Sequence, residues 1–337
     1  MNQAVRQTRT HIGELLARHG LRPRHDLGQN FLIDLNLLEF LVAQAELGPS
    51  DLVLEVGSGT GSLTACLAAQ AGAVISVEVD LRMQQLTAES VAGFSNVTLI
   101  GCDVLKNKNH FSPAVLEALD RGLGLCRRAP SPPAPLPQGE RGERVQSGAL
   151  KRLKLVANLP YGVATPVISN LVASDYPWER MVVTIQHELA QRMAARESTS
   201  NYGALSVWLQ AQCRLEVLKH LPPDVFWPRP KVASAMLRID PDPALRSKIS
   251  DREFLHRFLR EVFQQRRKLL RNVLIAMHRR ELARTQIDAV LEAHQLNSNA
   301  RAEELPPATL VRLSNDFSNL VSKTAADGSA SVAAIHN

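Results

Sequence analysis

The tetrapeptide Asn158-Leu159-Pro160-Tyr161 combines residue types that can act on an amino group attached to an aromatic ring. Such a group is a poor nucleophile because its lone pair is delocalised into the ring. The side-chain oxygen of Asn158 and the backbone carbonyl of Leu159, held outward by Pro160, would each accept one N–H and turn the lone pair towards an electrophile. Tyr161 would stack on the ring of a base that has left its helical stack. The tetrapeptide therefore predicts group transfer to an exocyclic amine.

Three features upstream of the tetrapeptide are typical of a site for an adenosine-containing cofactor. The apolar run 52–56 leads into a glycine-rich turn at 57–61, where the backbone can pass close to a ligand and adopt positive φ. Glu78 and Asp103 end the next two apolar runs, where carboxylates can accept ribose hydroxyls and an adenine amino group. Either carboxylate alone could be an exposed residue at a strand end. Their order after the glycine turn favours a cofactor site.

Short apolar segments alternate with helical stretches along this region, which is the signature of βαβ units around a parallel sheet buried on both faces. The predicted strands are 52–56, 74–77, 97–100, 153–157 and 181–185. A helix is predicted before them, with an N-cap at Asp34 and a C-terminal cap at Gly48.

The rest of the chain indicates a second domain. At 337 residues the chain exceeds a single core of roughly 250 residues. The stretch 121–151, with five prolines from Pro130 to Pro137, predicts a disordered insertion. From Asp251 the apolar residues recur at helical spacing, which predicts a small helical C-terminal domain. The stretch 324–337, rich in Ala, Ser and Gly, is predicted to be a mobile tail.

Composition narrows the class of protein further. The net charge of +6 favours polyanionic partners without identifying one. The four cysteines lie far apart and form no Cys-x-x-Cys pair, so neither a metal site nor a disulfide framework is expected. The N-terminus lacks the apolar stretch of a secretory signal, and no run of about 18 apolar residues occurs. We therefore expect a cytoplasmic protein with no membrane attachment.

With these motifs in this order, the chain resembles the ribosomal RNA small subunit adenine N6,N6-dimethyltransferase family, the kasugamycin-sensitivity methyltransferases. Besides the features above, the matching stretches are 27–32, 186–192, 202–207, 226–235 and 263–268. The resemblance implies an α/β fold, in which a Rossmann-like seven-stranded class I methyltransferase domain precedes a small helical C-terminal domain. It implies that a monomer uses S-adenosyl-L-methionine to dimethylate the N6 amino groups of two adjacent adenines. These adenines lie in a hairpin near the 3′ end of small-subunit (16S) rRNA, within immature 30S particles.

The resemblance also implies boundaries and roles for individual residues. It places the methyltransferase domain at 1–240, a helical RNA-binding domain at 241–323 and the tail at 324–337. Phe226 would be a second aromatic residue that stacks on the target base. After Tyr161 the family usually has Asn, whereas Gly162 follows here, so a side chain that could support the catalytic loop is absent. The implied cofactor contacts are Asn30, Leu32, Gly57, Glu78, Asp103 and Asn158.

A basic cluster in the C-terminal region is predicted to meet RNA phosphates, with Arg267 and Arg271 on one helical face. Its members are Arg266, Arg267, Lys268 and Arg271. Three alternatives stay open. The first is the related large-subunit RNA methylase that confers macrolide resistance, although the long arginine-rich C-terminal region favours the small subunit. The second is a ribosome-assembly checkpoint that binds immature subunits with little catalysis. The third is a nicotinamide oxidoreductase, whose fingerprint would place the third glycine one residue later.

Overall fold

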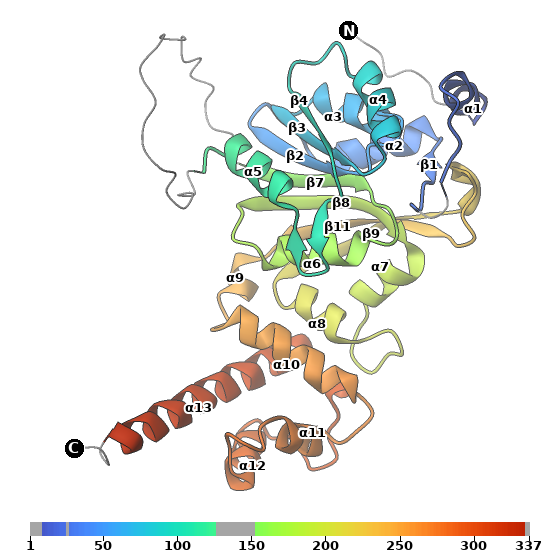
Figure 1. Cartoon of the computed structure of the whole chain (residues 1–337). Coiled ribbons are helices and arrows are strands. Elements are labelled where there is room, and N and C mark those ends of the chain that lie inside the picture. Colours follow the sequence, from blue (N-terminus) through green and yellow to red (C-terminus); the bar gives the residue numbers. More distant parts are fainter. Residues whose placement is uncertain (1–8, 25–26, 126–151, 334–337) are drawn as a thin grey trace, which may run out of the picture. The chain divides into compact units, whose positions relative to one another are not determined.

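The computed structural model describes residues 9–24, 27–125 and 152–333 (Figure 1). The chain divides into two compact units. The first comprises Met1–His187 and Leu218–Arg238, and the second comprises Glu188–Val217 and Ile239–Asn337. From residue 126 on, the predicted insertion 121–151 lies outside the described residues. The division of the chain at residues 240 and 323 stays a prediction.

A seven-stranded sheet with the order β4-β3-β2-β7-β8-β11-β9 confirms the α/β class. The neighbours β4, β3, β2, β7 and β8 pair in parallel, and these are the five strands that the apolar runs predicted. Two small sheets, β1-β10 and β5-β6, accompany it. The strand bounds are β1 Phe31–Leu32, β2 Asp51–Val56, β3 Ala73–Glu78, β4 Val97–Gly101, β5 Leu105–Asn107, β6 His110–Phe111, β7 Arg152–Asn158, β8 Trp178–Gln186, β9 Cys213–Leu221, β10 Phe226–Trp227 and β11 Ser234–Pro241.

Helices alternate with the parallel strands and then follow one another in the C-terminal region (Figure 1). The first group is α1 Arg9–Arg18, α2 Leu35–Gln44, α3 Ser62–Ala68, α4 Leu81–Ser90, α5 Pro113–Gly122, α6 Ala164–Ala173, α7 His187–Met193 and α8 Ala204–Gln210. The second group is α9 Pro243–Arg246, α10 Arg252–Gln264, α11 Leu270–Met277, α12 Arg284–Ala293 and α13 Pro307–Ala333. Two short 3-10 helices, Pro223–Val225 and Ala302–Glu304, complete the chain.

Helices cover both faces of the central strand β2. Leu41 of α2 and Leu67 of α3 belong to the same buried apolar cluster as Val53. The preceding residue of the strand, Leu52, points to the opposite face, where a Cβ at Gly122 of α5 would lie 2.7 Å from its Cδ2 atom. Every residue of β2 is buried. A strand enclosed in this way carries aliphatic residues on both faces, which is why Leu52, Val53, Leu54 and Val56 follow one another with only Glu55 between them.

Helix α2 begins where the sequence predicts and ends earlier. The side chain of Asp34 accepts hydrogen bonds from the N–H groups of Asn36 and Leu37, which confirms it as the N-cap. The C-terminal cap predicted at Gly48 is wrong, because the helix ends at Gln44. The two carbonyl oxygens just past the helix, those of Ala45 and Glu46, accept hydrogen bonds from Lys154 Nζ at 3.0 and 2.7 Å.

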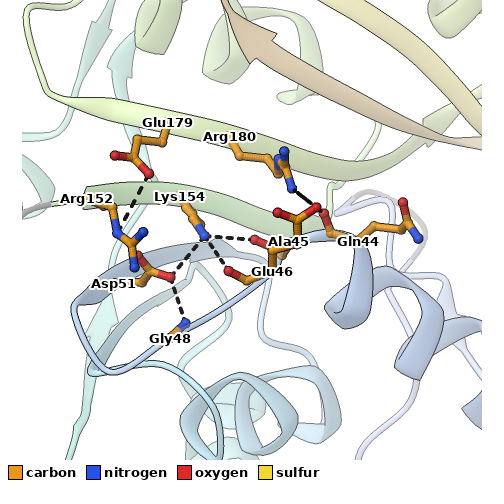
Figure 2. A network of polar contacts seen from close by, with 9 residues as sticks. All are labelled: Gln44, Ala45, Glu46, Gly48, Asp51, Arg152, Lys154, Glu179 and Arg180. Carbon is orange, nitrogen blue, oxygen red and sulfur yellow. Dashed lines mark hydrogen bonds and ion pairs between the residues drawn. The ribbon is translucent and has the colours of Figure 1, made fainter.

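The same lysine belongs to a network of charges at the first residues of β2, β7 and β8 (Figure 2). Asp51 is fully buried and lies 3.0 Å from Lys154 Nζ and 2.7 Å from Arg152 Nε. Arg180 makes a second ion pair with Glu46 at 2.7 Å. The network ties the amino ends of three strands to the loop after α2. The functional features lie at the carboxyl ends of the strands, so this network anchors the sheet at the opposite edge.

The C-terminal helices of the second unit have a shared apolar core. On α10 the buried residues recur at helical spacing, and Phe258 stacks on Phe317 of α13 at 6.2 Å between ring centroids. Helix α13 continues to Ala333, so the residues 324–333 extend this helix, in keeping with their alanine content. The mobility expected for 324–337 stays a prediction. Within the described ranges, no helix has the length and apolar character needed to cross a bilayer.

Candidate active site

A cavity of about 480 Å³ lies where β2, β3 and β7 end, within the first unit. Its size is in the range typical of small-molecule sites. The walls come from the residues that follow these strands and β4, and from the segment 27–31, which precedes the sheet. Eight of the sequence-predicted residues line it: Asn30, Gly57, Glu78, Asp103, Asn158, Leu159, Pro160 and Tyr161.

The glycine-rich turn forms a wall that side chains would close. Gly57 has φ +82°, and a Cβ there would lie 3.0 Å from Cγ of Pro160. Gly59 has φ +56°, and a Cβ there would lie 3.0 Å from the ring of Phe31. Both positions therefore need glycine for conformation and for space. The turn brings bare backbone to the cavity, which is the arrangement that lets a ligand lie against the main chain.

Two carboxylates, those of Glu78 and Asp103, also line the cavity, and backbone N–H groups orient their oxygen atoms. Glu78 Oε2 accepts from the N–H of Gly59 at 3.0 Å, and Oε1 accepts from the N–H of Asp80 at 3.0 Å. Each of these oxygens keeps a second lone pair for a ligand hydroxyl. Burial raises the pKa of the Glu78 carboxyl above its ordinary value, while the backbone N–H groups oppose that shift. Asp103 is exposed, and its Oδ1 accepts from the N–H of Leu105 at 2.9 Å.

Asn158 ends β7 and has a fixed side chain. Its Nδ2 donates to the carbonyl oxygen of Asn30 at 2.8 Å, which leaves the Oδ1 atom as the acceptor for a ligand. The N–H of Leu159 donates to the oxygen of Thr184 on β8 at 3.1 Å. Leu159 is only 1% exposed, yet its carbonyl oxygen accepts no hydrogen bond from the described residues. A buried carbonyl without a partner is costly, so this second acceptor suits a donor that comes from a ligand.

Tyr161 is half-buried on the cavity wall, and its hydroxyl group is hydrogen-bonded to Ser234 Oγ at 2.8 Å. Burial raises the pKa of the Tyr161 hydroxyl, so it stays protonated at neutral pH. Ser234 is fully buried at the start of β11. This bond fixes the ring at its far end. The ring thus has a constrained orientation beside the two acceptors.

The structure does not bring two of the sequence-predicted residues to this cavity. Phe226 is 3% exposed and packs in the same apolar cluster as Leu41, so its ring does not face the cavity. It pairs with Leu32 across the two-stranded sheet β1-β10. Leu32 lines a smaller neighbouring cavity of about 50 Å³, together with Gly57 and Asn158.

Gly162 follows Tyr161 and lines the cavity. A Cβ built on it would meet nothing within 4 Å. A side chain at this position would therefore point into open space, and its absence leaves no packing defect in the loop that follows β7.

The predicted basic cluster belongs to the second unit, where its members have different surroundings. Arg266 donates to the carbonyl oxygens of Ser200 and Tyr202 at 2.8 and 3.0 Å, and Arg271 forms two hydrogen bonds with Asp288. Arg267 and Lys268 are exposed. The prediction that Arg267 and Arg271 share a helical face is wrong. Helix α10 ends at Gln264 and α11 begins at Leu270, because the chain turns between them.

Sequence reasoning missed two residues that support the site. Phe31 lines both cavities, and the only local signal for it is an aromatic residue next to Asn30. Ser234 lies 73 positions from Tyr161, so no local pattern connects them. No group of three or more metal-ligating side chains occurs among the residues that the structure describes.

The comparisons with known proteins agree with this geometry. The family model described as ribosomal RNA adenine dimethylase matches residues 20–318. A relative from Halothermothrix orenii, named ribosomal RNA small subunit methyltransferase A, is 32% identical over 303 residues, which cover 90% of each chain. A relative of the same name from Pelotomaculum thermopropionicum is 38% identical over 265 residues, which cover 79% of this chain and 81% of the relative.

Solved structures show the same fold. A dimethyladenosine transferase from Plasmodium falciparum superposes with a TM-score of 0.64 at 21% identity, and the match covers 85% of this chain and 97% of that one. The 23S rRNA methyltransferase ErmE superposes with a TM-score of 0.55 at 22% identity, and the match covers 85% and 99% of the two chains. Because the family model spans most of the sequence and relatives exceed 30% identity over nearly all of it, the chain belongs to the ribosomal RNA adenine dimethylase family.

Proposed function

We propose that this protein transfers methyl groups from S-adenosyl-L-methionine to the N6 atoms of two adjacent adenines near the 3′ end of 16S rRNA. The observation that carries the proposal is the pair of acceptors at the end of β7. Asn158 Oδ1 is oriented by the bond from Nδ2 to Asn30, and the carbonyl oxygen of Leu159 is buried without a partner. An exocyclic amino group has two N–H donors, which match these two acceptors.

The cavity has the features that S-adenosyl-L-methionine requires. Gly57 and Gly59 leave space against the main chain, and Glu78 offers oriented oxygens for ribose hydroxyls. Asp103 offers an acceptor for the adenine amino group, while Asn30 and Leu32 would contribute the remaining contacts. When bound, this cofactor supplies an electrophilic methyl carbon. The residues fit the group, and each of these assignments is part of the proposal.

The chain's own residues would then prepare the amino group for attack. The two acceptors hold its N–H bonds in place, so the nitrogen lone pair is no longer shared with the ring and points along the line of displacement. The cofactor would supply the methyl group, and the nitrogen held by the two acceptors would release one proton once it is methylated. Because the methylated amine carries a positive charge and is acidic, water would suffice to take that proton. Pro160 and the ring of Tyr161 would hold the flipped base.

The substrate part of the proposal is supported by the names of the relatives, which specify the small ribosomal subunit. We infer that a monomer acts in the cytoplasm on immature 30S particles. The net charge of +6 suits an RNA partner. Arg267 and Lys268 are the members of the basic cluster best placed to meet phosphates, because both are exposed and have no ion-pair partner among the described residues.

The test is methyl transfer from labelled S-adenosyl-L-methionine to 30S particles that lack the modification, followed by mass spectrometry of the RNA. We expect four methyl groups per particle on two neighbouring adenines. Unmethylated 50S particles serve as the matched control, and label in their RNA instead would support the large-subunit alternative. Particle binding without any transfer would support the checkpoint alternative.

A further inference from the structure

The loop 228–233, here called the proline loop, joins β10 to β11, and its first end is fixed to one wall of the cavity. Its neighbour Trp227 pairs with Phe31 across the β1-β10 sheet, and the two rings stack at 6.4 Å between centroids. Phe31 lines the cavity. The loop therefore starts beside the wall that also carries Asn30.

The other end of the proline loop is fixed to the catalytic wall. Its last residue, Ala233, accepts a hydrogen bond from the N–H of His187 at 3.0 Å. The next residue, Ser234, is bonded to the hydroxyl group of Tyr161 at 2.8 Å. The loop thus runs from the Phe31 wall to the Tyr161 wall, and both anchors are residues that line the cavity.

The surface of the proline loop carries two unpartnered cations. Arg229 and Lys231 are exposed and make no ion pair or hydrogen bond with any described residue. Val232 beside them is 46% exposed, which is unusual for a large apolar side chain here. Pro228 and Pro230 fix two φ angles and remove two N–H donors. The backbone that carries the two charges therefore loses little conformational entropy when a ligand binds. It also lacks the row of N–H donors that a sheet edge would offer.

This surface suits a polynucleotide strand. A base that enters the cavity stays covalently linked to the phosphates on either side of it, so its backbone must lie close to the residues that frame the cavity. Cations between prolines offer phosphate contacts, while an exposed valine offers apolar area to a sugar or a base face. The loop itself contains no acidic residue. The acidic residue closest to it in the sequence is Asp224, which precedes β10.

We propose that the proline loop holds the RNA strand on either side of the target adenine, with Arg229 and Lys231 on the flanking phosphates and Val232 against the neighbouring nucleotide. The inference rests on the proposed function, because the substrate must be a polynucleotide. It assigns an RNA surface to the first unit, whereas the basic cluster around Arg267 belongs to the second.

Equilibrium binding of 30S particles lacking the modification, measured over a series of salt concentrations, tests the proposal. The variants are Arg229→Gln and Lys231→Gln. We expect each to weaken binding several-fold near 0.1 M salt and to lower the slope of log affinity against log salt by about 0.7 to 0.9. The affinity for S-adenosyl-L-methionine, measured by calorimetry, and the melting temperature should stay at wild-type values. Lys231→Arg keeps the charge and should bind as the wild type does.

The matched control is Arg121→Gln. Arg121 is an exposed cation at the C-terminal end of α5, where Asp120 is bonded to Tyr176 shortly before β8 begins. It therefore lies at the edge of the sheet opposite to the cavity, and its replacement should change neither affinity nor slope. Wild-type affinity and slope in both loop variants would overturn the proposal, as would an equal loss in the control. Because binding is measured apart from methyl transfer, an inactive wild type would reject only the proposed function.

Discussion

The side-chain amide of Asn158 donates to the carbonyl oxygen of Asn30 at 2.8 Å, and this bond decides which atom of Asn158 can serve a ligand. A carbonyl oxygen can only accept, so the amide nitrogen must face it and the amide oxygen must face elsewhere. The segment 27–31 thus orients the Asn158 amide as well as lining the cavity. The position of Asn30, before the sheet, therefore sets the orientation of Asn158 at the end of β7.

Replacing Asn158 tests the role of this oriented oxygen. In Asn158→Ala the acceptor is lost, and we expect kcat for methyl transfer to fall about 100- to 1,000-fold, as for other preorganised electrostatic groups. Asn158→Asp should lose a similar factor, because a carboxylate has no N–H for Asn30 and is repelled by its carbonyl. Particle binding should be unchanged in both variants. Retention of more than a tenth of the wild-type kcat by Asn158→Ala would show that the acceptor lies elsewhere.

The bond between Tyr161 and Ser234 predicts a thermodynamic coupling. Tyr161→Phe and Ser234→Ala each remove one partner, and we expect each to lower kcat about 2- to 10-fold because the ring loses its fixed orientation. The double variant should be no slower than the slower single variant, since both changes break one contact. Full multiplication of the two effects would mean that the bond does not position the ring.

Tyr176→Phe provides the control for this cycle. The hydroxyl group of Tyr176 is bonded to Asp120 at 2.9 Å, at the opposite edge of the sheet. Combined with Ser234→Ala, it should give effects on kcat that multiply, because the two sites share no partner. The affinity for S-adenosyl-L-methionine should be the same in all of these variants.

Local features of this fold could be predicted because their causes are local. The Asp34 cap depends on two adjacent N–H groups, and the strand 52–56 shows itself as a short run rich in aliphatic residues. The glycine turn depends on backbone angles that few other residues adopt. In each case the chemical reason lies within about six residues of the sequence, so the pattern is visible without the fold.

The features that the sequence could not predict depend on contacts between distant residues. Phe226 is buried because the two-residue strand β10 pairs with β1, and a strand this short has no readable periodicity. The basic cluster is divided between a turn after α10 and the start of α11, and Leu269 between them forms a bridge with the distant Arg301. The carbonyl oxygens just after α2 find their donor in Lys154, more than a hundred positions away.

The surroundings of the basic cluster predict two kinds of variant. Arg266→Ala removes bonds to the carbonyl oxygens of Ser200 and Tyr202 and an ion pair with Glu303 at 3.3 Å. We expect it to lower the free energy of unfolding by about 2 kcal/mol, because charged groups bind these oxygens strongly. Thermal and urea denaturation would measure this loss.

Arg267→Ala and Lys268→Ala should behave in the opposite way. Both side chains are exposed and unpaired among the described residues, so the unfolding midpoint should stay unchanged. The affinity for 30S particles should fall, and the slope of log affinity against log salt should drop by about 1 for each variant. A destabilised Arg267→Ala, or an Arg266→Ala of full stability, would contradict this division of the cluster.

Glu55 predicts an unusual dependence of stability on pH. Its carboxyl is fully buried in β2 and accepts bonds from the hydroxyl groups of Thr64 and Ser76, both at 2.6 Å. Burial raises the pKa of Glu55 to about 7 in the folded protein, against an ordinary value of 4.5. Between these two values the unfolded chain releases its proton and the folded chain keeps it. The free energy of unfolding therefore falls as the pH rises from 4.5 to 7 and levels off above.

Glu55→Gln separates this contribution from all others, because the amide keeps an oxygen for Thr64 and Ser76 but does not ionise. The free energy of unfolding, measured by urea denaturation, should fall between pH 5 and pH 8 in both proteins. The fall should be smaller in the variant than in the wild type by on the order of 3 kcal/mol. Glu117→Gln, at an exposed position of α5, is the matched control and should follow the wild type. Equal decreases in the wild type and Glu55→Gln would mean that Glu55 is already ionised at pH 5, with its charge stabilised by the two hydroxyl groups.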